Sequence, residues 1–199
     1  MAKNKEKTTK LVLLGLLTAI LFVMSYTPLG YLKIFGIEIT FNVIPVAIAA
    51  IALGTTGGIA VGAVFGLTSF LQCIQGTSAF GATLLGINPI FTAIVCLVPR
   101  ILAGLVAGAL HKPMAKKLGK KIPCFITGVL SAFLNTLFFM TALIILFGQS
   151  DYIMGMRGGM NLLAFVCAFV GINAVFEMLA STLISGAVGS ALYKAKAIK

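Results

Sequence analysis

The chain has 199 residues, of which 60% are hydrophobic and only 10% are charged, and its mean hydropathy is +1.12. A soluble domain of this size cannot bury so much apolar surface, so the composition excludes a soluble protein and predicts an integral membrane protein. The net charge of +11 does not indicate a nucleic-acid partner, because the cations lie at the ends of apolar segments, where they orient a membrane protein.

The apolar segments predict the number of spans. A helix needs roughly 20 mostly apolar residues to cross about 30 Å of hydrocarbon. In chain order the predicted spans are 10–27, 40–53, 57–74, 88–110, 122–147 and 160–193. The second is short, so we expect it to be tilted, partly re-entrant or extended into the preceding loop. We therefore predict an all-α membrane protein, a six-helix bundle that forms one domain over residues 1–199. The N-terminus, basic and then apolar, superficially resembles a signal peptide, but we expect it to remain as the first helix.

The distribution of lysine and arginine predicts the orientation. With an even number of spans, twelve cations fall on one side of the membrane, in the two termini and between the fourth and fifth spans. Only Lys33 and Arg157 fall on the other side. By the positive-inside rule we expect a multi-pass protein of the plasma membrane with both termini in the cytoplasm. Three longer loops, 28–39, 75–87 and 148–159, then face outward and are candidates to cover a binding cavity.

Two ionisable residues lie deep within the predicted spans, Arg100 in the fourth and Glu177 in the sixth. A charge at the centre of a membrane helix costs about 2.5–3.5 kcal/mol on insertion scales, so such residues usually face a partner or a functional cavity. Arg100 follows Pro99, whose missing N–H frees a backbone carbonyl. Three interpretations stay open: Arg100 pairs with Glu177, its side chain reaches toward solvent, or its guanidinium binds the acid group of a transported anion.

Amide side chains recur at or near the outer halves of the spans. An unpaired amide is costly in hydrocarbon, so each is expected to bond to a neighbouring helix or, together with an arginine, to form a polar pocket for a small molecule. Besides Arg100 and Glu177, the candidate ligand contacts are Asn42, Gln72, Asn88, Asn135 and Asn173. Asn135 and Asn173 are the strongest amide candidates, because the fifth span carries further hydroxyl side chains.

Gly15 and Ala19 place two small residues four positions apart on one face of the first helix. This spacing lets another helix approach closely, either within the chain or from a partner subunit. On its own the pattern is more typical of packing within the chain.

Enzymatic chemistry has little support in the sequence. The four cysteines are scattered without a Cys-x-x-Cys pair, and the single histidine, His111, cannot complete a metal site with them. Neither a Ser-His-Asp set nor a phosphate-binding GxxxxGKS/T loop is present. We therefore expect a protein that is not an enzyme, holds no cofactor or metal, and does not hydrolyse ATP by itself.

Three stretches of sequence, the size and the six spans resemble the substrate-binding S components of energy-coupling factor (ECF) vitamin transporters. The stretches are 40–46 (TFNVIPV), 62–70 (GAVFGLTSF) and 86–100, which contains GINP and VPR. The resemblance covers nearly the whole chain and implies a vitamin site near the outer face, with a membrane T component and two cytoplasmic ATPases as partners. It also implies docking on the T component through the first helix, where Gly15 stands in place of the first alanine of the family's AxxxA pattern.

The sequence is similar to S components of the pantothenate type, and a vitamin with a carboxylate suits Arg100. Riboflavin or another vitamin stays open, because phenylalanine and tyrosine can stack on a flat ring even without tryptophan. Two other classes also stay open. One is a standalone secondary transporter coupled to protons or sodium through Glu177, and the other is a membrane scaffold in which Arg100 and Glu177 merely pair.

Overall fold

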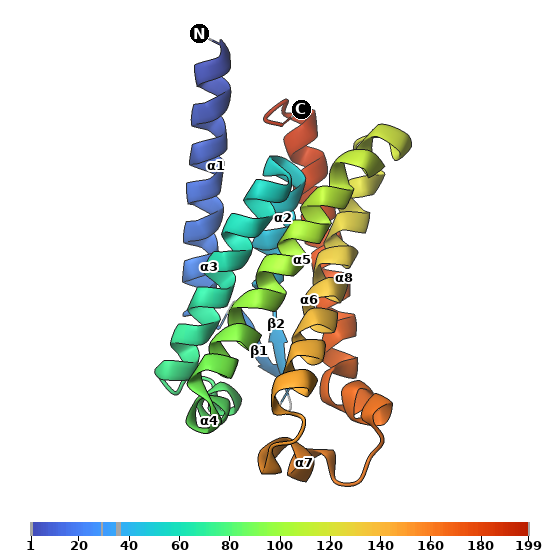
Figure 1. Ribbon diagram of the computed structural model, residues 1–199. Coiled ribbons are helices and arrows are strands. Elements are labelled where there is room, and N and C mark those ends of the chain that lie inside the picture. The colour runs from blue at the N-terminus through green and yellow to red at the C-terminus, as the bar shows by residue number, and fades with distance from the viewer. Residues whose placement is uncertain (1, 29, 35–36, 199) are drawn as a thin grey trace.

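The computed structural model describes residues 2–28, 30–34 and 37–198. In this part of the chain the elements are α1 (Ala2–Ser25), β1 (Tyr31–Ile34), β2 (Ile37–Thr40), α2 (Val43–Leu53), α3 (Thr55–Ile74), α4 (Ala79–Ile87), α5 (Pro89–Leu118), α6 (Ile122–Phe147), α7 (Asp151–Arg157) and α8 (Leu162–Lys194). The long helices run up and down between the two ends of the molecule (Figure 1). Both termini lie at one end, α4 and α7 lie at the opposite end, and the hairpin lies in the same half as α4 and α7.

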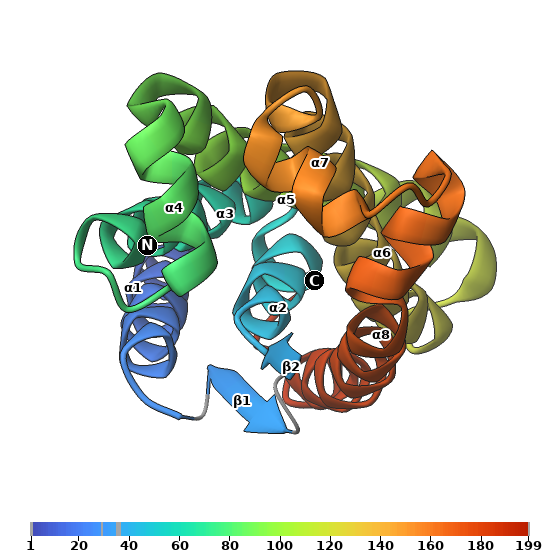
Figure 2. The same ribbon diagram turned by 90° about the horizontal axis from the view of Figure 1, so that it is seen from below.

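The short helix α2 lies at the centre of the bundle. Its residues are almost all apolar, and those from Val43 to Ile51 are buried, because α1, α3, α5, α6 and α8 pack around it (Figure 2). A helix that is apolar all round belongs in such a position. Pro45 lies in the first turn, where its missing N–H costs no helical hydrogen bond. With 11 residues and a length of about 16 Å, α2 is too short to cross the membrane alone. The predicted span 40–53 is therefore a buried helix that is preceded in the chain by β2.

Among the described residues, five helical segments are long and apolar enough to cross a membrane: Lys7–Ser25, Thr55–Ile74, Pro89–Leu118, Ile122–Phe147 and Asn173–Lys194. They correspond to the predicted first, third, fourth, fifth and sixth spans. A sixth crossing arises only if α7 and the first turns of α8, which meet at an angle of 85°, are taken as one broken span. The count of six and the orientation of the termini therefore stay predictions.

The three segments expected to be outer loops contain regular structure. The segment 28–39 enters an antiparallel hairpin, the one departure from an all-helical fold in the described chain. The segments 75–87 and 148–159 contain α4 and α7, which begin after Ser78 and Ser150. In each case the serine hydroxyl accepts a hydrogen bond from a backbone N–H of the first turn, which is the usual way of satisfying the free donors at a helix start.

Close packing of α3 against α5 fixes the position of the deep arginine. A Cβ atom added to Gly58 would lie 2.2 Å from the carbonyl oxygen of Gly104, and one added to Gly104 would lie 2.1 Å from that of Gly58. One turn along α3, a Cβ at Gly62 would lie 2.5 Å from the carbonyl oxygen of Arg100. These separations are far below van der Waals contact, so only glycine permits the two backbones to approach so closely.

We predict that Gly58→Ala lowers the thermal unfolding midpoint of the purified protein, because the added methyl group overpacks the α3–α5 contact at a cost of about 1–3 kcal/mol. Gly171→Ala in α8 is the matched control, since its added Cβ meets no atom within 4 Å. That change should leave stability equal or raise it by up to about 1 kcal/mol. Equal midpoints for the two variants would contradict the packing argument.

Candidate ligand-binding cavity

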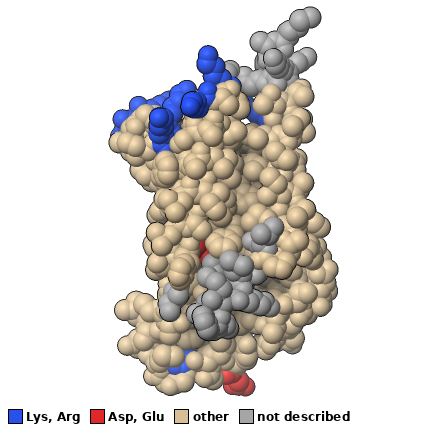
Figure 3. Space-filling model, turned by 180° about the vertical axis from the view of Figure 1, so that it is seen from behind, with Lys and Arg blue, Asp and Glu red and all other residues tan. Residues whose placement is uncertain are grey.

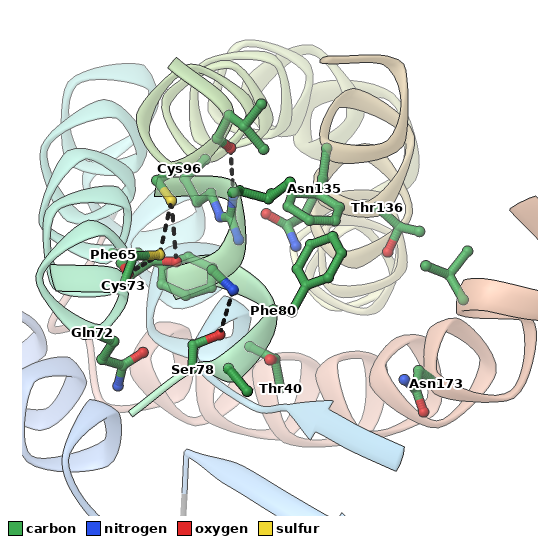
Figure 4. A pocket seen from close by; sticks show the side chains of 18 of the residues that line it. Thr40, Phe65, Gln72, Cys73, Ser78, Phe80, Cys96, Asn135, Thr136 and Asn173 are labelled. Carbon is green, nitrogen blue, oxygen red and sulfur yellow. Dashed lines mark hydrogen bonds between the residues drawn. The ribbon is translucent and has the colours of Figure 1, made fainter. Parts of the chain in front are cut away.

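A cavity of about 1160 Å³ lies in the half of the bundle that carries α4 and α7. Residues from α3, α5, α6 and α8 form its wall, and residues of α4, α7 and the end of α1 also line it. Polar side chains and aromatic rings both line it (Figure 4). A space of this size, mostly apolar with a few convergent polar groups, suits a small organic molecule.

Five of the seven predicted contact residues line this cavity: Gln72, Arg100, Asn135, Asn173 and Glu177. Figure 4 shows Gln72, Asn135 and Asn173 on three different helices around the same space. The fold therefore brings together side chains that are far apart in the sequence.

Asn42 and Asn88 are not among the lining residues. Each of them makes hydrogen bonds elsewhere in the structure. The side-chain oxygen of Asn88 accepts hydrogen bonds from the N–H groups of Ile90 and Phe91, both at 3.1 Å, and so caps α5. Asn42 is fully buried and donates to the hydroxyl of Ser25 at 3.2 Å, which ties the start of α2 to the end of α1. These hydrogen bonds give both residues a structural role, and their expected role as ligand contacts stays a prediction.

The guanidinium of Arg100 is held in a defined orientation. Pro99 has no N–H, so the carbonyl of Val95 lacks its helical donor, and Arg100 Nη1 donates to this oxygen at 2.6 Å. The predicted free carbonyl is thus confirmed. The guanidinium carbon lies 5.3 Å from the ring centre of Phe65 on α3 and 4.8 Å from that of Phe139 on α6, distances typical of cation–π contacts. Within the described chain, Arg100 Nε has no hydrogen-bond partner.

Glu177 lines the same cavity but does not pair with Arg100. Its Oε1 accepts a hydrogen bond from the backbone N–H of Thr40, the last residue of β2, at 2.9 Å. The carboxylate therefore satisfies a donor at the end of the hairpin, where an unmet N–H would be costly in an apolar environment. Among the described residues no ion pair joins Glu177 to Arg100, so the cavity presents two opposite charges as separate groups.

The two strongest amide candidates also carry unused acceptors. The side-chain oxygens of Asn135 and Asn173 are buried and have no hydrogen-bond partner in the described part of the chain. A buried acceptor without a donor costs about 1–3 kcal/mol. In a cavity wall, such oxygens are placed to accept from the N–H or O–H groups of a bound molecule.

Several lining residues were missed at the sequence level. Phe80, Tyr152 and Phe169 form an aromatic cluster, with ring centres 6.0 Å apart for Phe80 and Tyr152 and 5.3 Å apart for Phe80 and Phe169. Phe80 and Tyr152 belong to segments that the sequence predicts to be loops, so no periodic pattern marks them. Phe65 and Phe139 lie inside spans, where an aromatic residue usually indicates ordinary packing.

Comparison with known proteins gives consistent matches along the chain. Residues 9–188 match the family model described as "ECF transporter, substrate-specific component". The "Pantothenate transporter PanT" of Leuconostoc mesenteroides is 32% identical over 199 residues, covering 96% of this chain and 95% of the relative. The "Pantothenic acid transporter PanT" of Lactococcus lactis is 24% identical over 208 residues, covering 97% and 98%.

Two cysteines on the cavity wall offer a direct check of its geometry. Cys73 on α3 and Cys96 on α5 are buried, and their sulfur atoms lie 3.7 Å apart. The sequence suggested only scattered core residues. The packing of α3 against α5 instead brings the two thiols into contact (Figure 4).

We predict that a mild thiol oxidant forms a Cys73–Cys96 disulfide, because the sulfur atoms need to approach by only about 1.6 Å to reach bonding distance. Mass spectrometry of the oxidised protein should show the loss of two hydrogen atoms and a cross-linked peptide pair. Cys73→Ser should abolish this product, whereas substitution of the exposed Cys167 should not. A cross-link between any other pair of cysteines would contradict the described contact of α3 and α5.

Proposed function

Because this chain belongs to the family of substrate-specific components of ECF transporters, we propose that it is a vitamin-binding S component and that its substrate is pantothenate. The near full-length similarity to two proteins named as pantothenate transporters supports this choice of substrate. The structural observation that carries the proposal is the guanidinium of Arg100, oriented in the wall of a cavity large enough for a vitamin.

Arg100 is proposed to bind the carboxylate of the vitamin. A guanidinium binds a carboxylate through two parallel N–H donors. Here one N–H is fixed by the carbonyl of Val95, and the rings of Phe65 and Phe139 fix the position of the guanidinium. Since the side chain is already ordered, little conformational entropy is lost when the anion binds.

The other polar groups suit the remainder of the molecule. Pantothenate carries hydroxyl groups at the end remote from its carboxylate and a secondary amide between them. Asn135 and Asn173 supply acceptors for such N–H and O–H groups. Glu177 repels a carboxylate but accepts from a hydroxyl, so we assign the hydroxyl end of the vitamin to its side of the cavity.

The aromatic cluster of Phe80, Tyr152 and Phe169 favours a second candidate, a vitamin with a flat ring such as riboflavin. Mass spectrometry of the small molecule released from the purified protein distinguishes the two. Recovery of pantothenate supports the first proposal, and recovery of a flavin replaces it. Membership of the ECF family argues against the two other classes left open by the sequence, the standalone ion-coupled carrier and the scaffold.

As an S component, the protein is proposed to work with a membrane T component and two cytoplasmic ATPases. The positive-inside rule then places both termini in the cytoplasm of the cell and the cavity toward the outside. Gly15 and Ala19 are exposed on α1, as are the larger neighbours Leu11, Val12 and Leu16. This face of α1 is not covered by the described residues of the chain and is the proposed contact with the T component.

We predict that Arg100→Ala weakens pantothenate binding at least about 30-fold, equal to roughly 2 kcal/mol, because the vitamin's buried carboxylate loses its partner. Arg100→Lys keeps the charge but loses the fork of donors, so we expect an intermediate loss. Isothermal titration of the purified protein measures both. Arg157→Ala, which removes the same charge outside the cavity lining, is the control. Unchanged affinity in Arg100→Ala would remove this residue from the site.

We predict that Gly15→Leu and Ala19→Leu reduce assembly with the T component and ATPases about tenfold, since overpacking a close helix contact costs about 1–3 kcal/mol. Pantothenate binding by the isolated subunit should stay unchanged, because both positions lie outside the cavity lining. Co-purification with tagged partners measures assembly. Ala109→Leu, the same kind of change at an exposed position of α5 away from this face, serves as the control. Normal assembly of both small-residue variants would rule out this docking face.

A further inference from the structure

A second cavity, of about 860 Å³, lies at the opposite end of the molecule, beside both termini. Five lysines from different parts of the chain line it: Lys10, Lys112, Lys116, Lys120 and Lys196. Figure 3 shows the cations gathered at this end of the molecule. Nothing in the proposed capture of a vitamin uses this cavity.

The positive charge around this cavity is not balanced by its own wall. Among the described residues that line it, none is acidic. In the described part of the chain, Lys112, Lys116 and Lys196 have no ion pair, and Lys120 lies over the ring of Tyr193 at 5.2 Å. Several cations that converge on one recess raise the local potential and attract an anion.

Neutral and apolar side chains also line this cavity. His111 is buried and fixed by two hydrogen bonds, at 2.8 Å to the hydroxyl of Thr127 and at 3.1 Å to that of Tyr193. Leu13 and Ile51 are among the apolar lining residues. A cavity lined by both cations and apolar side chains fits an amphipathic anion better than a fully hydrated one.

The C-terminus of α8 adds a cation by way of an uncommon backbone conformation. The N–H of Lys196 bonds to the carbonyl of Tyr193 at 3.1 Å, and that of Ala197 bonds to the carbonyl of Leu192 at 3.0 Å. These two bonds form a Schellman motif, whose left-handed position is usually occupied by glycine. Here Lys196 holds that position with φ of 55°. Because glycine fits this conformation without strain, the presence of lysine indicates a use for its side chain.

We propose that this second cavity binds the phosphate group of an anionic ligand, namely the headgroup of an anionic phospholipid such as phosphatidylglycerol. Lys116 lies in the last turn of α5, and Lys120 and Lys196 lie just beyond the ends of α5 and α8. Basic pockets between membrane helices bind phosphate-bearing lipids. A soluble phosphate offers the same chemistry without an acyl chain. The apolar wall favours the lipid.

Two general trends explain why lysines occur at this end of the molecule, but they do not explain why five of them line one cavity. Cations favour the C-terminal end of a helix such as α5 and the cytoplasmic side of a membrane. Lys117, in the last turn of α5, satisfies both trends, and Lys121, the N-cap residue of α6, satisfies the second, yet neither lines the cavity. They therefore provide a control that matches the cavity lysines in charge and in position along the chain.

The test compares two double variants of the full-length protein, Lys116→Gln with Lys120→Gln and Lys117→Gln with Lys121→Gln. Native mass spectrometry in neutral detergent measures binding of phosphatidylglycerol, with phosphatidylcholine as the uncharged reference. We expect each cavity lysine to contribute about fivefold in affinity, or about 25-fold for the pair, whereas the control pair stays near the parent protein. Equal losses in the two variants, or equal affinity of the parent protein for both lipids, would overturn the proposal.

Lys196→Gly separates lipid binding from folding. Glycine suits the left-handed position, so the unfolding midpoint should stay equal or rise, while phosphatidylglycerol affinity falls about fivefold. Unchanged affinity would remove Lys196 from the site.

Competition with inorganic phosphate identifies the source of the ligand. If phosphatidylglycerol stays bound at a large excess of phosphate, the result supports the lipid site. If inorganic phosphate displaces phosphatidylglycerol at an equal concentration, the lipid proposal is overturned and the cavity is assigned to a soluble phosphate.

Discussion

The hydrogen bond from Arg100 to the carbonyl of Val95 makes the deep arginine compatible with an apolar bundle. In a regular helix that carbonyl is already bonded to a backbone N–H. Pro99 removes the backbone donor and so creates an acceptor one turn away from the charge. The neighbouring rings of Phe65 and Phe139 add cation–π contacts. The cost of burying the charge is thus offset locally, and the remaining donors are available to a ligand.

The close contact of α3 with α5 also determines the positions of other groups in the cavity wall. Where the backbones of Gly58 and Gly104 touch, no side chain can separate the two helices. Toward the cavity, the same register places Phe65 beside Arg100 and Cys73 beside Cys96. A shift of α5 along α3 would therefore change the cation–π contact, the thiol contact and the position of the guanidinium together. The geometry of the site therefore depends on this one helix contact.

The two ends of the bundle have different chemistry. At the end with α4 and α7, Arg100 and Glu177 bring opposite charges to one cavity and act on different partners. At the end with the termini, lysines gather without a carboxylate in the cavity they line. The first arrangement suits the small molecule with an acid group and neutral donors that we propose as the substrate. The second suits the anionic headgroup that we propose for the other cavity.

The membrane class, the long apolar helices, the placement of Arg100 and Glu177 within apolar helices and the carbonyl freed beside Pro99 could all be predicted from the amino-acid sequence. These properties depend on composition and on neighbours within a few residues, and the resemblance to ECF S components rests on continuous stretches of chain. The buried central position of Val43–Leu53, and the bond of Glu177 to the hairpin rather than to Arg100, followed only from the three-dimensional packing. It also decided which amides face the cavity. Those outcomes depend on the rotation and spacing of helices far apart in sequence, which no local pattern encodes.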